Sequence, residues 1–221
     1  MTRFAYIHGF ASGPSSKKGN TFAAAFREAG AEFYLPDLNV PSFERLTYTG
    51  MLAGVDALDR AVGGDGRPWG FVGSSMGGWV AARWAELHPD RVVRLLLLAP
   101  GFDLPNRWRG LIDEERLRRW EEEGSIATTD GSGADARLHW GFMTDARAQP
   151  PWPEPHCPTL VLHGRHDAVV PLAVSEEFAR SRPHVTLETV DDDHDLLRTL
   201  PDLLARALEW FGVAPAGRTG R

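Results

Sequence analysis

Cysteine is nearly absent from the sequence: Cys157 is the only one in 221 residues. A single cysteine cannot form an internal disulfide, so a secreted scaffold held by disulfides is excluded. Neither Cys-x-x-Cys nor His-Glu-x-x-His occurs, and these are the spacings that hold zinc. We therefore expect no metal and no other cofactor.

Long apolar runs are also absent. No stretch of about 18 apolar residues occurs, and a stretch of about that length is needed to cross a membrane. The apolar segment at residues 4–7 is too short for the core of a signal peptide. We therefore expect no membrane span and a cytoplasmic location.

Positive charge is in deficit. The chain has 24 lysines and arginines against 30 aspartates and glutamates, a formal net charge of -6. An acidic surface repels the phosphate backbone, so no nucleic-acid partner is expected. The remaining composition, 43% hydrophobic and 24% charged, is that of a folded globular protein. The length is that of one domain, which we assign to residues 1–221.

Short apolar runs alternate with stretches of helical spacing along the chain. The runs predict strands at 4–7, 32–35, 69–73, 92–99, 159–163 and 185–190. The intervening patterns predict helices at 21–29, 46–62, 77–88, 172–180 and 196–211. This alternation indicates an α/β fold with a mostly parallel sheet of about six strands flanked by helices.

Residues 101–153 interrupt the alternation. The segment contains Trp108, Trp120, Trp140 and Trp152, a cluster of charged residues and a proline-rich exit. It is too short for a domain of its own. We interpret it as a small helical cap inserted between two strands.

The sharpest motif is Gly-Ser-Ser-Met-Gly at residues 73–77, a match to G-x-S-x-G. It follows a predicted strand and precedes a predicted helix, the context in which this motif forms a nucleophile elbow. Side chains two positions either side of the nucleophile would collide with so tight a turn, which explains the flanking glycines. The motif predicts Ser75 as nucleophile. Ser74 lacks the symmetric glycines and is the weaker candidate.

A serine hydroxyl needs a base, and the base needs a partner that fixes its tautomer. In enzymes with this elbow the partners follow in the order serine, acid, histidine. Asp167 follows the strand at 159–163 and His194 follows the last strand, so we predict the triad Ser75, Asp167 and His194. His166 is a rival base. Asp103, after the strand at 92–99, is an alternative acid.

The tetrahedral intermediate of acyl transfer needs two backbone N–H donors. Met76, directly after the nucleophile, should supply one, and Phe10, in the loop after the first strand, should supply the other. We also expect Phe10, Trp79, Trp108 and Trp140 to line an acyl pocket, although each could equally belong to a hydrophobic core.

These motifs together carry a family resemblance. Residues 8–10 (His-Gly-Phe), 73–77, 163–167 (His-Gly-Arg-His-Asp) and His194 resemble the α/β-hydrolase fold from end to end. Residues 8–17 are similar to the HGF-x-S-x-P-x-S-x-K pattern of small bacterial YqiA-like esterases. The resemblance implies a serine carboxylesterase or thioesterase that acts on small to medium acyl groups. The tryptophan-rich segment looks longer than in that family.

Other functions remain open at this stage. A lyase or an acyltransferase could use the same triad, and a non-catalytic binding protein could share the fold. A candidate for every triad position favours an enzyme, and a serine at the elbow argues against dehalogenases and epoxide hydrolases, which use aspartate there. The expected partner is a small-molecule ester or thioester, with a homodimer as a further possibility.

Overall fold

A computed structural model describes residues 1–107 and 110–214. Its centre is a six-stranded sheet with the strand order β2-β1-β3-β4-β7-β8. All five neighbouring pairs are parallel, so the predicted fold class is confirmed. The strands are β1 (Arg3–Ile7), β2 (Phe33–Tyr34), β3 (Trp69–Ser74), β4 (Val92–Leu98), β7 (Thr159–Gly164) and β8 (Val185–Val190).

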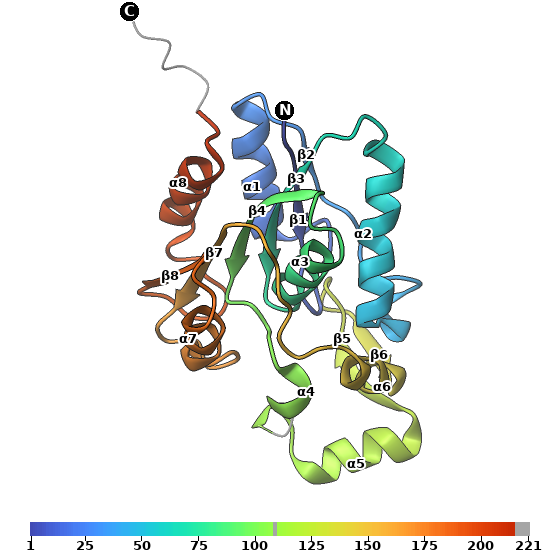
Figure 1. Ribbon diagram of the computed structural model, residues 1–221. Helices are drawn as coiled ribbons and strands as arrows, with labels where there is room; N and C mark the ends of the chain where they lie inside the picture. Colours follow the sequence, from blue (N-terminus) through green and yellow to red (C-terminus); the bar gives the residue numbers. More distant parts are fainter. Residues whose placement is uncertain (108–109, 215–221) are drawn as a thin grey trace, which may run out of the picture.

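Helices cover both faces of the sheet (Figure 1). One face packs on α1 (Lys17–Glu28) and α8 (Leu200–Phe211), and the other on α2 (Tyr48–Val62), α3 (Met76–Leu87) and α7 (Leu172–Arg180). Alternate side chains of β4 enter different cores: Leu95 and Leu97 join one cluster, Leu96 and Leu98 the other. A strand segment buried on both faces must be apolar at every position, which explains the four consecutive leucines at 95–98.

Helix α1 begins four residues before the predicted start. Ser16 caps it by accepting a hydrogen bond from the Gly19 amide at 3.1 Å. A Cβ at Gly19 would lie 2.9 Å from the Tyr6 ring, so this glycine lets the helix approach the sheet closely. Residues 17–20, outside the predicted helix, are therefore the first turn of α1.

Helix α8 begins at Leu200, four residues after the predicted start. Leu196 has a left-handed φ of 52°, which a continuous helix does not allow. The Asp192 carboxylate accepts hydrogen bonds from both the amide and the hydroxyl of Thr199, each at 2.8 Å. The segment after β8 is therefore a fixed loop.

The cap lies beyond the carboxyl ends of the strands, at the bottom of Figure 1. It contains α4 (Leu104–Arg107), α5 (Glu114–Glu123), β5 (Ser125–Thr129), β6 (Asp135–His139) and α6 (Gly141–Ala148). Strands β5 and β6 form an antiparallel hairpin, so the predicted helical cap contains a β-hairpin beside its helices. The hairpin completes a small core in which Trp120 packs edge-on against Trp140 and donates to the Leu138 carbonyl.

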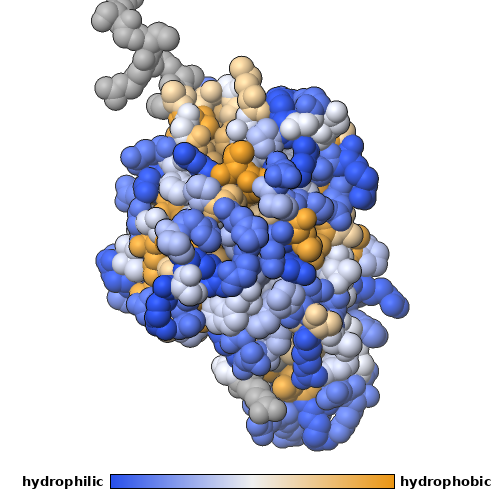
Figure 2. Space-filling view, viewed as in Figure 1, coloured by the Kyte–Doolittle hydropathy of each residue, from blue (hydrophilic) through white to orange (hydrophobic). Residues whose placement is uncertain are grey.

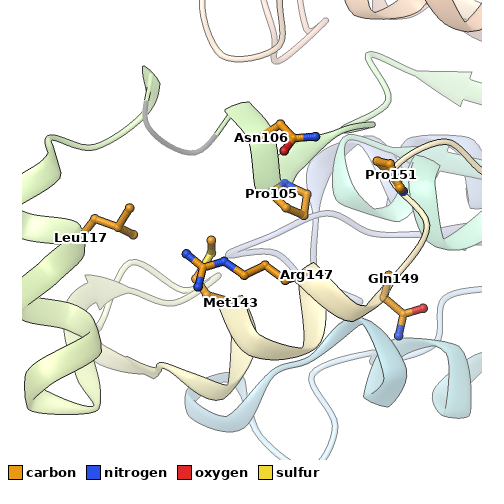
Figure 3. Close-up of a pocket in the computed structure, with 7 residues that line it drawn as sticks. All are labelled: Pro105, Asn106, Leu117, Met143, Arg147, Gln149 and Pro151. Carbon is orange, nitrogen blue, oxygen red and sulfur yellow. The ribbon is translucent and has the colours of Figure 1, made fainter.

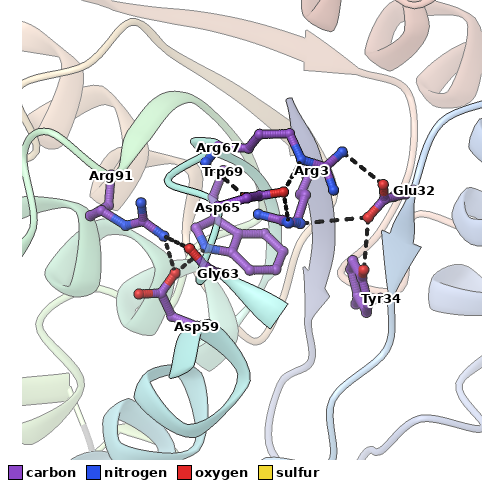
Figure 4. Close-up of polar contacts among 9 residues, drawn as sticks. All are labelled: Arg3, Glu32, Tyr34, Asp59, Gly63, Asp65, Arg67, Trp69 and Arg91. Carbon is purple, nitrogen blue, oxygen red and sulfur yellow. Dashed lines mark hydrogen bonds and ion pairs between the residues drawn. The ribbon is translucent and has the colours of Figure 1, made fainter. Parts of the chain in front are cut away.

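The opposite end of the sheet carries an ion-pair network (Figure 4). Arg67 donates to Glu32 and to Asp65 at 2.7 Å each, and Arg3 of β1 donates to Asp65 at 2.5 Å. Because the network lies at the amino ends of β1 and β3, it is far from the cap. Its role is to join the strands to their flanking loops.

The surface seen in Figure 2 is mostly hydrophilic, with apolar patches scattered over it. Within the described ranges, no helix has the length and apolar character that crossing a bilayer requires.

Candidate active site

The turn between β3 and α3 places Ser75 at the carboxyl edge of the sheet. Ser75 has φ 52° and ψ -121°, a backbone conformation that is strained for any residue except glycine. Its carbonyl accepts hydrogen bonds from the amides of Gly78 and Gly101, each at 2.8 Å, which hold the strained turn in place. This is the geometry of a nucleophile elbow.

The glycines that flank Ser75 are required by backbone packing. A Cβ at Gly77 would lie 2.0 Å from the Ile7 carbonyl oxygen, and one at Gly73 would lie 2.6 Å from the Gly77 carbonyl oxygen. Both obstacles are main-chain atoms, which cannot rotate away. The spacing of the motif thus follows from the close approach of α3 to β1.

Ser75, His194 and Asp167 form a chain of hydrogen bonds. His194 Nε2 lies 3.1 Å from Ser75 Oγ, and His194 Nδ1 lies 2.7 Å from Asp167 Oδ2. The Asp167 side chain is fully buried, whereas that of His194 is 20% exposed. An imidazole held in this way can take a proton from the serine on one side while the carboxylate fixes its tautomer on the other.

Asp167 is surrounded by hydrogen-bond donors. The amides of Val169 and Val170 donate to Oδ1 at 2.8 and 2.7 Å, and His163 Nε2 lies 3.2 Å from Oδ2. Burial by itself would raise the pKa of this carboxyl, but the hydrogen bonds from His163, His194 and Val170 outweigh it. The pKa of Asp167 is held well below its ordinary value, so the group is an anion at neutral pH.

The rival residues have other partners. His166 is exposed and pairs with Asp191 at 2.8 Å. Asp103 accepts a hydrogen bond from the Asn106 amide at 2.6 Å, and its own amide donates to the Pro151 carbonyl. Within the described residues, neither contacts His194 or Ser75.

The two amides expected to hold the oxyanion are those of Met76 and Phe10. Neither donates to an acceptor in the part of the chain that the structure describes. The loop after β1 comes close to the nucleophile, since a Cβ at Gly9 would lie 3.2 Å from Ser75 Cβ. Both amides therefore belong to segments beside Ser75.

His8 anchors the loop after β1. Its buried ring accepts a hydrogen bond from the Leu38 amide at Nε2, at 2.9 Å, and its Nδ1 lies 3.0 Å from the Gly9 carbonyl oxygen. Burial is the main cause that lowers the pKa of His8. A neutral imidazole that donates on one side and accepts on the other thus fixes the loop that carries Phe10.

Two cavities meet at Ser75. The first, about 150 Å³, extends towards the cap and is mostly apolar; its walls include Phe10, Met76, Leu104 and Phe142. The second, about 270 Å³, lies between the loop after β1 and the His194 loop. It is lined by Ser12, Ser16, Lys17, Lys18, Asp195 and others. The site therefore offers, on either side of the nucleophile, one apolar compartment and one lined by both polar and apolar side chains.

The predicted pocket residues lie in different surroundings. Phe10 lines both cavities at Ser75, but neither cavity is lined by Trp79 or Trp140 within the described residues. Trp79 is buried, donates to the Pro150 carbonyl at 2.9 Å and packs edge-on against Tyr48. Trp140 packs within the cap. Trp79 and Trp140 therefore pack in the hydrophobic core, the other role that the sequence left open for them, and Trp108 lies outside the described residues.

A larger cavity, about 570 Å³, lies elsewhere (Figure 3). It is bounded by Asn106 of α4, Leu117 of α5 and Met143 and Arg147 of α6, and no triad candidate lines it. This cavity is not the candidate reaction site, because none of its described wall residues is a nucleophile or a base.

Sequence reasoning missed three residues at the site: His163, Tyr48 and Arg107. His163 ends a predicted strand, and its place beside a candidate acid in the same five-residue segment was a usable signal. Tyr48 and Arg107 line the apolar cavity from α2 and α4. No local pattern brings those two together. Across residues 1–107 and 110–214, no cluster of three or more His, Cys, Asp or Glu residues suits a metal ion.

The model of the uncharacterised protein family UPF0227 matches residues 3–210, nearly the whole chain. The chain belongs to UPF0227. This is the YqiA-like family, so the resemblance noted in the sequence is confirmed. The fold of this UPF0227 chain is the α/β-hydrolase fold.

Curated relatives of this UPF0227 protein are hydrolases. The 2-hydroxymuconate semialdehyde hydrolase of Pseudomonas putida is 27% identical over 220 residues, covering 82% of this chain and 76% of the relative. The mitochondrial palmitoyl-protein thioesterase ABHD10 of mouse is 26% identical over 152 residues. That match covers 61% of this chain and spans about half the length of the mouse protein.

Among solved structures, Est1E of Butyrivibrio proteoclasticus with bound ferulic acid has a TM-score of 0.80. The two are 21% identical, and the match covers 96% of this chain and 88% of Est1E. Mouse ABHD10 itself gives a TM-score of 0.72 at 21% identity, covering 95% of this chain and 89% of that structure. These likenesses show the fold.

Proposed function

We propose that this protein is a serine hydrolase that cleaves carboxylic esters or thioesters of short acyl groups. The observation that carries the proposal is the hydrogen-bond chain from Ser75 through His194 to Asp167, set on a strained elbow. The hydrolase relatives support the reaction class. The small apolar cavity at Ser75 supports a short acyl group, because 150 Å³ is about the volume that five waters occupy in the liquid.

The reaction would proceed in two steps. Ser75 Oγ attacks the acyl carbonyl while His194 Nε2 takes its proton, and the amides of Met76 and Phe10 hold the oxyanion. His194 then gives the proton to the departing alcohol or thiol, which leaves an acyl-enzyme. Water, deprotonated by His194, then attacks the acyl-enzyme. The tetrahedral intermediate that forms releases the acid, and His194 returns a proton to Ser75 Oγ.

The test is hydrolysis of p-nitrophenyl esters from acetate to palmitate, with labelling by a fluorophosphonate probe. We expect turnover of the short esters and labelling of the native protein. Ser75→Ala should lose both, with kcat lower by at least about 10³-fold. Ser74→Ala is the matched control on the same turn, and it should still be labelled.

The results also separate the alternatives. A protein that labels at Ser75 but hydrolyses no ester would favour a lyase or an acyltransferase on the same triad. A protein that neither labels nor hydrolyses would contradict the proposal and favour a binding role.

A further inference from the structure

The apolar cavity at Ser75 contains one hydroxyl with no partner. Tyr48 is 2% exposed and lines this cavity, and its Oη has no hydrogen-bond partner among the described residues. Burying a hydroxyl without a partner is unfavourable, because its bonds to water are not replaced. An acceptor that enters the cavity with the substrate would replace them.

The same cavity is lined by a positive charge. Arg107 of α4 donates to the carbonyls of Phe102 and Val169, at 2.9 and 2.8 Å, and these contacts fix the guanidinium at the cavity wall. Both acceptors are neutral. Arg107 forms no ion pair with any carboxylate in the part of the chain that the structure describes, although Asp103 and Asp167 lie near enough to act on its charge. Arg107 is half-buried, and burial lowers its pKa more than the nearby charges of Asp103 and Asp167 raise it.

The rest of the cavity offers these two groups no anionic partner. Among the residues that the structure describes, its remaining walls include Leu104, Leu111 and Phe142 and no carboxylate. A donor hydroxyl and an unpaired guanidinium in apolar surroundings are the two features that recognise a carboxylate.

We infer that the acyl compartment takes an acyl group that ends in a carboxylate: a half-ester or half-thioester of a short dicarboxylic acid. This rests on the proposed function of the site. The cavity volume of about 150 Å³ corresponds to about five water-sized groups. The succinyl group has five heavy atoms beyond its reacting carbonyl and is the size we expect. Tyr48 would donate to the terminal carboxylate and Arg107 would balance its charge, so both would determine specificity.

The test compares three p-nitrophenyl esters of nearly one shape: pentanoate, 4-oxopentanoate and the half-ester of succinate. We expect the native protein to prefer the succinate half-ester over pentanoate by at least about tenfold in kcat/KM. Tyr48→Phe should reduce that preference by about tenfold. Each preference is measured relative to pentanoate. Arg107→Met should reduce the preference for the succinate half-ester more than it reduces the preference for the 4-oxo ester. Tyr34→Phe is the matched control, because the Tyr34 hydroxyl pairs with exposed Glu32, and the preference should not change.

A native preference for pentanoate would overturn the inference, and so would a Tyr48→Phe preference within about twofold of the native one. Equal rates for the 4-oxo and succinate esters, both unaffected by Arg107→Met, would also overturn it, since charge would not be recognised.

Calorimetry on Ser75→Ala separates this inference from the proposed function. The variant should bind methyl hydrogen succinate at least about tenfold more tightly than methyl pentanoate. Selective binding without hydrolysis by the native protein would refute the esterase proposal and keep the compartment's preference. Hydrolysis without selective binding would support the esterase proposal and refute the preference of the compartment for a carboxylate.

Discussion

Asp167 holds its negative charge in a fully buried position, and the proposed mechanism depends on that charge. Asp167→Asn keeps the shape but presents an amide to His194 Nδ1, which favours the wrong tautomer. We expect kcat for short esters to fall by about 10³ to 10⁴-fold with a smaller change in KM. Asp191→Asn is the control, since Asp191 pairs with exposed His166. Equal rates for Asp167→Asn and the native protein would exclude Asp167 from the triad.

Cys157 is a buried acid in which the effect of burial on the pKa is not outweighed by hydrogen bonds. It is 8% exposed, and burial raises the pKa of its thiol to about 11. At pH 8 the native protein should therefore react with iodoacetamide roughly 100-fold more slowly than the chain unfolded in guanidinium, because the thiolate is the nucleophile. Mass spectrometry of timed samples measures both rates. Rapid, complete labelling of the folded protein would contradict this account.

At the scale of elements, the contact between α3 and β1 controls the elbow. Gly77→Ala places a Cβ where the Ile7 carbonyl oxygen stands, so the helix must move away from the strand. We expect a loss of about 1–3 kcal/mol in the free energy of unfolding, measured by urea titration, together with loss of esterase activity. Gly64→Ala is the control, because nothing lies within 4 Å of a Cβ there. If both variants were equally stable, the backbone contact would not constrain the turn.

The elements that the sequence predicted well are those whose signal is local. Strand β4 and the turn at residues 73–77 can be predicted from local sequence. A strand buried on both faces needs apolar residues, and a strained turn needs glycines at fixed positions. The order rule then placed Asp167 and His194. The hairpin in the cap was missed because it is stabilised by Trp120 across the chain rather than by its own alternation. Tyr48 and Arg107 line the same cavity only because of how α2 and α4 pack, and no short sequence pattern predicts that packing.

For the whole molecule, pH acts on stability through His8. Burial lowers the pKa of His8 in the folded state, so below about pH 7 the unfolded chain takes up a proton there that the folded protein does not. The folded state binds fewer protons, and His8 should therefore make stability fall as pH falls through the ordinary histidine range. His8→Gln should flatten the dependence between pH 8 and pH 5 in urea titrations. Exposed His156→Gln should leave it unchanged, and an unaltered slope in His8→Gln would refute the assignment.

The three triad candidates come from loops that follow β3, β7 and β8, and the last of these strands lies at one edge of the sheet. During synthesis the elbow leaves the ribosome long before His194 does, so for much of its elongation a nascent chain carries the candidate nucleophile Ser75 without its candidate base. A serine-directed probe should be silent on any fragment that ends before residue 194 and should report, in refolding, only the molecules whose last strand has docked. The rate at which Ser75 becomes reactive during refolding would thus measure the rate at which β8 joins the sheet.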